Sequence, residues 1–270
     1  MILKTYTKAT KAAMKSCGKT WHKPHFTPGV NVENIRPHST PWTVAFCVRK
    51  GGNYSALNCL EQGQGSIVGK RWVLSFSPLR DPGTNTMVKQ KEIAYIKAGA
   101  FNLTAKELQS NVYKIKAIHS HPRAGFFKHK GYDIALYELE TDVEFTDCVQ
   151  PICLPEDDKW LKRVNGTVIH VIGWNHYKLT MNPALQQSYA TVINWNLLPR
   201  VYFSVTKPLH YKMISGAQLV NNRNGTWFQY GIFAGSFIYN HQYYGNFGRV
   251  GSFCAWIKSM SRNEVQCQPE

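Results

Sequence analysis

Residues 65–79 read GSIVGKRWVLSFSPL and contain two short groups of apolar residues. The first group covers 67–68, the second covers 72–76, and Gly69 lies between them. Pro78 closes the second group, since proline lacks the backbone N–H that a strand interior needs. The pattern predicts a short buried strand, a turn at Gly69 and a second buried strand.

The same stretch resembles a segment of the chymotrypsin-like serine proteases, where Cys-Gly-Gly-Ser-Leu-Ile is followed by Val-Leu-Thr-Ala-Ala-His-Cys. In this alignment Pro78 takes the place of the catalytic histidine, and Gly63 and Leu79 take the places of two half-cystines. The Ser-His-Asp mechanism needs an imidazole that first accepts and then returns a proton. Proline has no titratable atom, so the resemblance implies the family's fold with a defective catalytic site.

Four further stretches extend this resemblance across the chain. They are PWTV at 41–44, GYDIALYEL at 131–139, CVQPICLP at 148–155 and GNFGRVGSFCAWI at 245–257. The resemblance implies an all-β fold of two six-stranded antiparallel β-barrels of the trypsin-like type, with a short C-terminal helix. It implies a trypsin-like domain at 29–270, preceded at 1–28 by a basic tail and a light-chain-like segment. The many β-branched and aromatic residues also favour an all-β protein.

The other two positions of the catalytic triad are occupied by Asp133 and Ser215 in this alignment. Asp133 follows Gly131-Tyr132 at the start of the Asp-Ile-Ala-Leu motif, and we expect a buried, hydrogen-bonded carboxylate without a catalytic partner. Ser215 opens SGAQLV, but Met213 and Ile214 stand where the family has glycine and aspartate. A side chain at 213 disfavours the backbone donor of an oxyanion hole, whose loss costs about 3 to 4 kcal/mol in related sites.

The resemblance also predicts that the chain is not activated by a trypsin-like cut. The processing site falls at Pro28-Gly29, where the family has arginine or lysine followed by isoleucine. The freed terminus would pair with an aspartate at the position of Ile214, so both halves of that ion pair are missing. The base of the specificity pocket corresponds to Leu209, which provides no anionic group.

Three functional hypotheses follow from these departures. The first is a non-catalytic secreted serine protease homologue that binds or regulates a protein partner or a polyanion, with Pro78, Asp133 and Ser215 as vestigial triad positions. The second is an active trypsin-like endopeptidase that uses Ser215 with a non-standard base. The third is a gene product without a selected activity. We expect no cofactor and no metal site, since the chain has no motif for either.

The seven cysteines lack the CxxC spacing of zinc and redox sites and predict disulfides. Cys47 and Cys59 bracket a loop that a local disulfide would close at its base. The resemblance implies a second pair between Cys17 and Cys153. The odd number leaves one thiol free or intermolecular, and the pairing among the other three stays open. These are Cys148, Cys254 and Cys267.

Glycosylation motifs favour a secreted, extracellular protein. The four sequons begin at Asn53, Asn102, Asn165 and Asn224. No secretory signal is visible at the start of the chain, because 1–16 carries four lysines and no apolar block. No run of eighteen apolar residues occurs, so we expect no membrane span.

The net charge of +16 arises from 32 lysines and arginines against 16 acids, and 159–263 contains no acid at all. Clustered cations attract polyanions through long-range steering and counterion release. For a secreted protein, heparin-like glycans or anionic surfaces are better candidates than nucleic acid, although a solvated basic surface without a partner explains the same composition. The polyanion-binding candidates are Lys114, Lys116, Arg123, Lys128 and Lys130. The sequence carries no sign of an oligomeric state.

Overall fold

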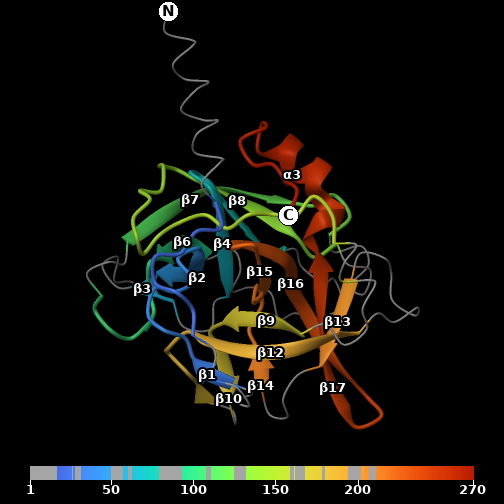
Figure 1. The fold of residues 1–270 in the computed structure, drawn as a ribbon. Helices are drawn as coiled ribbons and strands as arrows, with labels where there is room; N and C mark the ends of the chain where they lie inside the picture. The colour runs from blue at the N-terminus through green and yellow to red at the C-terminus, as the bar shows by residue number, and fades with distance from the viewer. Residues whose placement is uncertain are drawn as a thin grey trace, which may run out of the picture.

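The computed structural model of the chain forms two β-barrels that pack side by side (Figure 1). It describes residues 17–25, 27, 32–49, 57–59, 63–78, 93–107, 111–124, 132–158, 161, 168–177, 180–193, 202–206 and 211–270. Among these residues, no helix has the length and apolarity that crossing a membrane requires.

The first barrel closes six antiparallel strands through hydrogen bonds between β2 and β6. In the order of the sheet, these strands are β2 (Thr43–Arg49), β4 (Gln64–Gly69), β5 (Trp72–Ser75), β8 (Ala135–Leu139), β7 (Asn111–Ser120) and β6 (Ile93–Ala98). The short strand β3 (Leu57–Asn58) pairs with β2 outside the closed ring.

The second barrel closes six antiparallel strands through β12 and β9. They follow the order β12 (Gln186–Ile193), β13 (Tyr202–Thr206), β17 (Gln242–Arg249), β16 (Thr226–Tyr239), β15 (Gln218–Arg223) and β9 (Val168–Gly173). The strand β1 (Val32–Asn34) pairs with β12. A small separate sheet contains β11 (Thr180–Met181), β10 (Asn175–Tyr177) and β14 (Tyr211–Met213).

The sequence-predicted pair of strands at 65–79 is present as β4 and β5. Gly69 is the last residue of β4, and the turn itself is formed by Lys70 and Arg71. Residues 64–68 and the whole of β5 are buried, since the strands face the barrel core on one side and packed chain on the other. The backbone N–H of Ile152, for instance, donates to the carbonyl of Ile67 at 2.9 Å.

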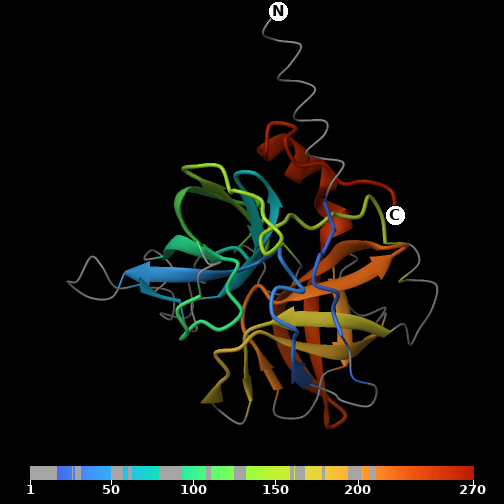
Figure 2. The ribbon, with the colours of Figure 1, turned by 60° about the vertical axis from the view of Figure 1, so that its left-hand side comes forward.

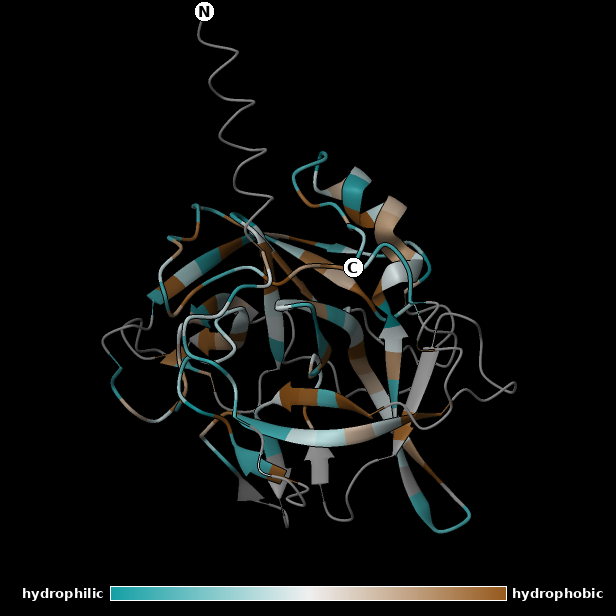
Figure 3. Ribbon diagram, in the orientation of Figure 1, coloured by the Kyte–Doolittle hydropathy of each residue, from teal (hydrophilic) through white to brown (hydrophobic). Residues whose placement is uncertain are grey.

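The chain ends in the short 3₁₀ helix η2 (Val250–Phe253) and the helix α3 (Cys254–Met260), which lie at the top of both ribbon views (Figures 1 and 2). The residues after α3 fold back onto the barrels. Val265 is buried, Trp72 Nε1 donates to Glu264 Oε2 at 2.9 Å, and Gln268 Nε2 donates to Cys17 Sγ at 2.7 Å. The tip of the β16–β17 hairpin, in contrast, is hydrophilic (Figure 3).

Three disulfides join these parts. Cys17 is bonded to Cys153 and Cys47 to Cys59, which are the two pairs named from the sequence. The third pair, which the sequence left open, joins Cys254 at the start of α3 to Cys267 in the C-terminal segment. Cys148 remains as a partly buried free thiol.

Candidate functional site

Asp133 lies against the backbone beside Pro78. The Ser77 backbone N–H donates to Asp133 Oδ1 at 2.8 Å, and the Ser77 hydroxyl donates to Ser120 Oγ at 2.9 Å. Pro78 itself has no N–H to offer. Burial raises the pKa of Asp133 to about 6, because the Ser77 hydrogen bond only partly offsets the loss of solvation of the charged carboxylate.

Two described histidines lie at the end of β7 or just after it, and both make contacts with other residues. His119 Nε2 lies 3.1 Å from Glu138 Oε2, and its ring packs 5.7 Å from the ring of Trp72. His121 stacks on Tyr132 with ring centroids 5.0 Å apart. These contacts of the two imidazoles are with Glu138, Trp72 and Tyr132, not with Asp133 or Ser215.

Ser215 is exposed on the turn that follows β14. Its carbonyl accepts the backbone N–H of Gln64 in the first barrel at 3.1 Å, so the turn is tied across the barrel interface. Gly216, with φ of +86°, follows at the closest approach, and a Cβ there would stand 1.8 Å from the Gln64 carbonyl oxygen. Only glycine fits this position, because it tolerates both the positive φ and the contact.

Two buried amide side chains hold the residue before Ser215. Gln64 Nε2 donates to the Ile214 carbonyl at 3.2 Å, while Gln64 Oε1 accepts the backbone N–H of Trp174 at 2.8 Å. Asn175 Oδ1 accepts the Ile214 backbone N–H at 3.3 Å. Ile214 has no carboxylate that could pair with a freed terminus. The neutral amides of Gln64 and Asn175 hold its backbone instead.

The interior behind Ser215 is filled by apolar side chains. Met213 is buried, and a Cβ on Gly245 would stand 2.8 Å from Met213 Cε. Phe233 and Phe247, which face each other across β16 and β17, pack with ring centroids 5.5 Å apart in the same core cluster as Met213. The sequence-predicted pocket residue Leu209 lies outside the described residues.

Gln218, the fourth residue of the SGAQLV motif at 215–220, also connects the two barrels. Its Oε1 accepts Trp42 Nε1 at 2.9 Å and the Thr43 hydroxyl at 3.3 Å, and its Nε2 donates to the Gly65 carbonyl at 2.9 Å. The side chain is fully buried and its polar atoms are bonded. Neither Gln64 nor Gln218 was predicted from the sequence, although a glutamine beside apolar strand residues indicates a buried amide with hydrogen-bond partners.

Comparison with known proteins places this geometry in a family. The family model described as Trypsin matches residues 30–257. The chain belongs to the trypsin family. It is 26% identical over 241 residues to human atrial natriuretic peptide-converting enzyme, which covers 83% of this chain and 21% of that protein. It is 30% identical over 115 residues to bovine coagulation factor XI, which covers 43% of this chain and 17% of that protein. The chain thus matches about a fifth of the length of either relative.

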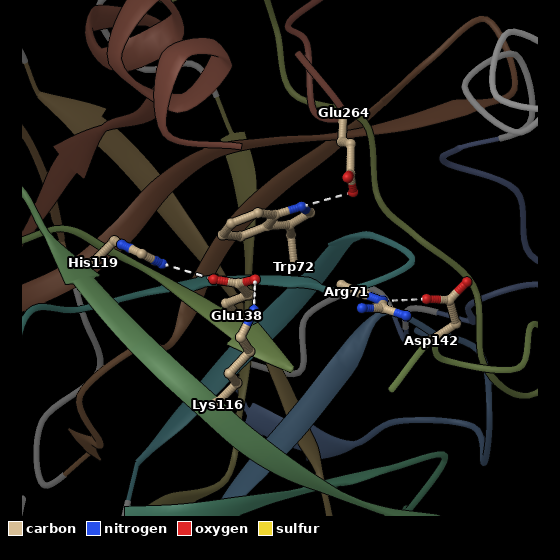
Figure 4. Close-up of polar contacts among 7 residues, drawn as sticks. All are labelled: Arg71, Trp72, Lys116, His119, Glu138, Asp142 and Glu264. Atoms are coloured by element: carbon tan, nitrogen blue, oxygen red, sulfur yellow. Dashed lines mark hydrogen bonds and ion pairs between the residues drawn. The ribbon is translucent and has the colours of Figure 1, made fainter. Parts of the chain in front are cut away.

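Two of the five polyanion candidates on this trypsin-family scaffold are already paired with acids. Lys114 Nζ lies 2.6 Å from Glu140 and Lys116 Nζ lies 2.8 Å from Glu138. Figure 4 shows Lys116 and His119, both on β7, reaching the Glu138 carboxylate on β8. The hydrogen bond from Lys116 lowers the pKa of Glu138 against its burial, and the contact with His119 acts in the same direction.

The third described candidate, Arg123, is held by an aromatic ring. Its guanidinium lies 5.2 Å from the ring centroid of Tyr132 and donates to the Tyr132 hydroxyl at 2.8 Å. Lys128 and Lys130 lie outside the described residues. So do 16 of the 32 lysines and arginines, together with only 3 of the 16 acids. Most of the positive excess therefore belongs to segments beyond the described part of the chain.

The structure describes two of the four sequons. Asn102 Oδ1 accepts both the backbone N–H and the hydroxyl of Thr104, at 3.0 and 2.8 Å. Asn224 is exposed in the turn between β15 and β16. Asn53 and Asn165 lie outside the described residues. Across the described ranges, no group of three or more histidines, cysteines or acids is placed to hold a metal ion.

Proposed function

We propose that this protein is a non-catalytic member of the trypsin family that acts extracellularly by binding a protein partner or an anionic glycan. The observation that carries the proposal is the contact of Asp133 with Ser77, the residue before Pro78. The family's mechanism requires an imidazole between the aspartate and the serine as general base and general acid. In the alignment given above, that place belongs to a residue without a titratable group.

The surroundings of Ser215 support the proposal independently of the alignment at Pro78. The backbone of Ile214 is fixed by the neutral amides of Gln64 and Asn175, so the turn needs no ion pair with a freed terminus. Met213 packs its side chain into the core behind the turn. In an active member of the family, by contrast, the catalytic serine needs preorganised hydrogen-bond donors for the oxyanion and space for the substrate.

The extracellular part of the proposal rests on the covalent chemistry of the chain. The chain has three disulfides. Disulfides persist in oxidising compartments and are rare in cytosolic proteins. The two described sequons lie outside the hydrophobic cores, at Asn102 and Asn224, as attachment of a glycan requires.

The anionic-glycan part of the proposal rests on the distribution of charge. The chain has a net charge of +16, and the described acids neutralise several of the described cations in pairs. A cation without a carboxylate partner releases more counterions from a polyanion than a paired one. We therefore place the main attraction for a heparin-like glycan in other basic segments of the chain rather than at Lys114 and Lys116, whose carboxylate partners compete with the glycan.

Incubation with a mixed peptide library, before and after treatment with trypsin, tests the lack of proteolysis. The secreted wild-type protein and its Ser215→Ala variant should give the same peptide products by mass spectrometry. New cleavage products that appear with wild type and disappear with Ser215→Ala would overturn the non-catalytic proposal and favour an endopeptidase with a non-standard base.

A further inference from the structure

A small cavity opens where three distant parts of the chain meet. It has a volume of about 230 Å³. Cys17 and Lys19 line it on one side, four residues between 223 and 228 around the β15–β16 turn line it on another, and 268–270 of the C-terminal segment complete it. The disulfide of Cys17 ties the first of these parts to the body, and the disulfide between Cys254 and Cys267 ties the last. Two of the three parts that line the cavity are thus held by disulfides.

Hydrogen bonds and ion pairs between the three segments give the cavity a polar lining. Lys19 Nζ donates to the Thr226 hydroxyl at 3.3 Å, and Arg223 Nε lies 3.2 Å from Glu270 Oε2. The buried ring of Phe228 adds an apolar part to the wall. Donors, an acceptor and an apolar surface together suit a ligand that is neutral, hydroxyl-rich and small.

Asn224 lines this cavity from the turn between β15 and β16. Asn224 and Gly225 have φ of +50° and +83°, so they form a two-residue hairpin turn in which both central residues are left-handed. The Asn224 side chain is exposed, and its amide makes no hydrogen bond within the described part of the chain. Asn224-Gly225-Thr226 is a glycosylation sequon.

We infer that Asn224 carries an N-linked glycan whose first sugar residue is seated in this cavity. The inference rests on the proposed extracellular route, because the donor is a lipid-linked oligosaccharyl diphosphate of the secretory pathway. In the transfer, Asn224 Nδ2 forms a bond to the anomeric carbon of the sugar. The bond from that carbon to the diphosphate breaks, the lipid diphosphate leaves, and the amide loses one proton.

Covalent attachment makes a modest cavity sufficient for this role. The cavity is smaller than the roughly 300 Å³ at which sites for drug-sized ligands begin, which excludes a larger free ligand on size. A short tether holds the sugar at an effective concentration of about millimolar, so weak hydrogen bonds to Lys19 and Arg223 keep it seated. The glycan would then join the N-terminal segment, the hairpin and the C-terminal segment on one face.

The test compares enzymatic removal of the Asn224 glycan from native and unfolded protein secreted by mammalian cells. An amidase that cleaves the bond to asparagine, used in heavy-oxygen water, marks each released site for peptide mapping. A seated sugar protects the bond, so we expect release from native protein to be slower by about tenfold than from unfolded protein. In Lys19→Ala the native rate should rise towards the unfolded rate, and Lys19→Arg should retain protection.

Lys23→Ala provides the matched control, because Lys23 is an exposed lysine of the same segment that does not line the cavity. It should behave as wild type. An unmodified Asn224 would overturn the inference, and equal release from native and unfolded protein would overturn the seat. A secreted protein that is glycosylated at Asn102 but shows either of these results would leave the proposed function standing, so the two failures are distinguishable.

Discussion

At the scale of single residues, Asp133 combines a buried carboxylate with a single hydrogen bond from the Ser77 backbone. The family's aspartate has a histidine to orient and to stabilise as an imidazolium. Among the described residues no cation compensates the carboxylate, and burial raises its pKa to about 6. Asp133, at the position that the family uses for catalysis, therefore lowers the free energy of unfolding near neutral pH.

Asp133→Asn should therefore stabilise the protein at pH 8 and change little at pH 4. The folded pKa of about 6 lies above the ordinary aspartate pKa of 3.8, so the unfolded state loses its proton first as the pH rises. Stability falls between those two values, by about 3 kcal/mol at most. Urea unfolding of wild type and variant at both pH values measures the difference.

Glu144→Gln serves as the control, since Glu144 is exposed and a surface substitution changes stability by about 0.5 kcal/mol or less. If Asp133→Asn destabilised the protein equally at both pH values, the carboxylate would be performing a favourable structural role. The account of a buried charge without compensation would then be wrong.

At the scale of elements, the two barrels are joined by side-chain amides. Gln64 on β4 bonds to Trp174 and Ile214, and Gln218 on β15 bonds to Trp42, Thr43 and Gly65. Every one of these bonds spans more than a hundred residues of sequence. Together they fix the Ser215 turn in the uncut chain.

Gln218→Ala should lower the free energy of unfolding by about 3 kcal/mol. The truncation removes three hydrogen bonds and leaves the buried Trp42 Nε1 donor without its acceptor. Denaturant unfolding measures the loss against Gln150→Ala, whose partly buried side chain makes one hydrogen bond to Thr146. We expect that control to lose less than about 1 kcal/mol. A similar loss in both variants would show that the cross-barrel amide is dispensable.

The strand pair could be predicted from a local hydrophobic pattern with turn residues, whereas the two barrels were implied by the family resemblance. The pair predicted at 65–79 is present as β4 and β5, while for Asp133 the resemblance implied a buried, hydrogen-bonded carboxylate without naming its partner Ser77. The partners of Gln64, Gln218 and Lys116 could not be predicted, because they depend on which strands become neighbours. The bond between Cys254 and Cys267 was open for the same reason, since spacing alone does not choose among three cysteines.

At the scale of the whole molecule, the disulfides predict a definite thiol content. Unfolding without reductant should expose a single alkylatable cysteine, Cys148, whereas all seven should react after reduction. Peptide mapping after iodoacetamide treatment locates the labels. Label on Cys254 or Cys267 in the unreduced protein would contradict the third disulfide.

The charge of the whole molecule gives a second prediction, on a heparin column. Lys4→Ala/Lys8→Ala and Lys114→Ala/Lys116→Ala remove equal charge, but the second pair already has carboxylate partners. Only lysines that contact the polymer release counterions. Removing one of them reduces the steepness with which affinity falls with salt by about one, on a plot of log affinity against log salt. We expect the tail variant to elute at lower salt. A larger effect of the β7 pair would return the polyanion site to that strand.

The central claim, that the protein uses the trypsin-family fold without its catalysis, is tested most directly by labelling with a fluorophosphonate. The probe reacts with a serine that is activated by a base and faces an oxyanion hole, and it requires no knowledge of the substrate. The secreted protein should remain unlabelled before and after trypsin treatment, while trypsin in a parallel reaction is labelled. Label on wild type that is lost in Ser215→Ala would contradict the claim.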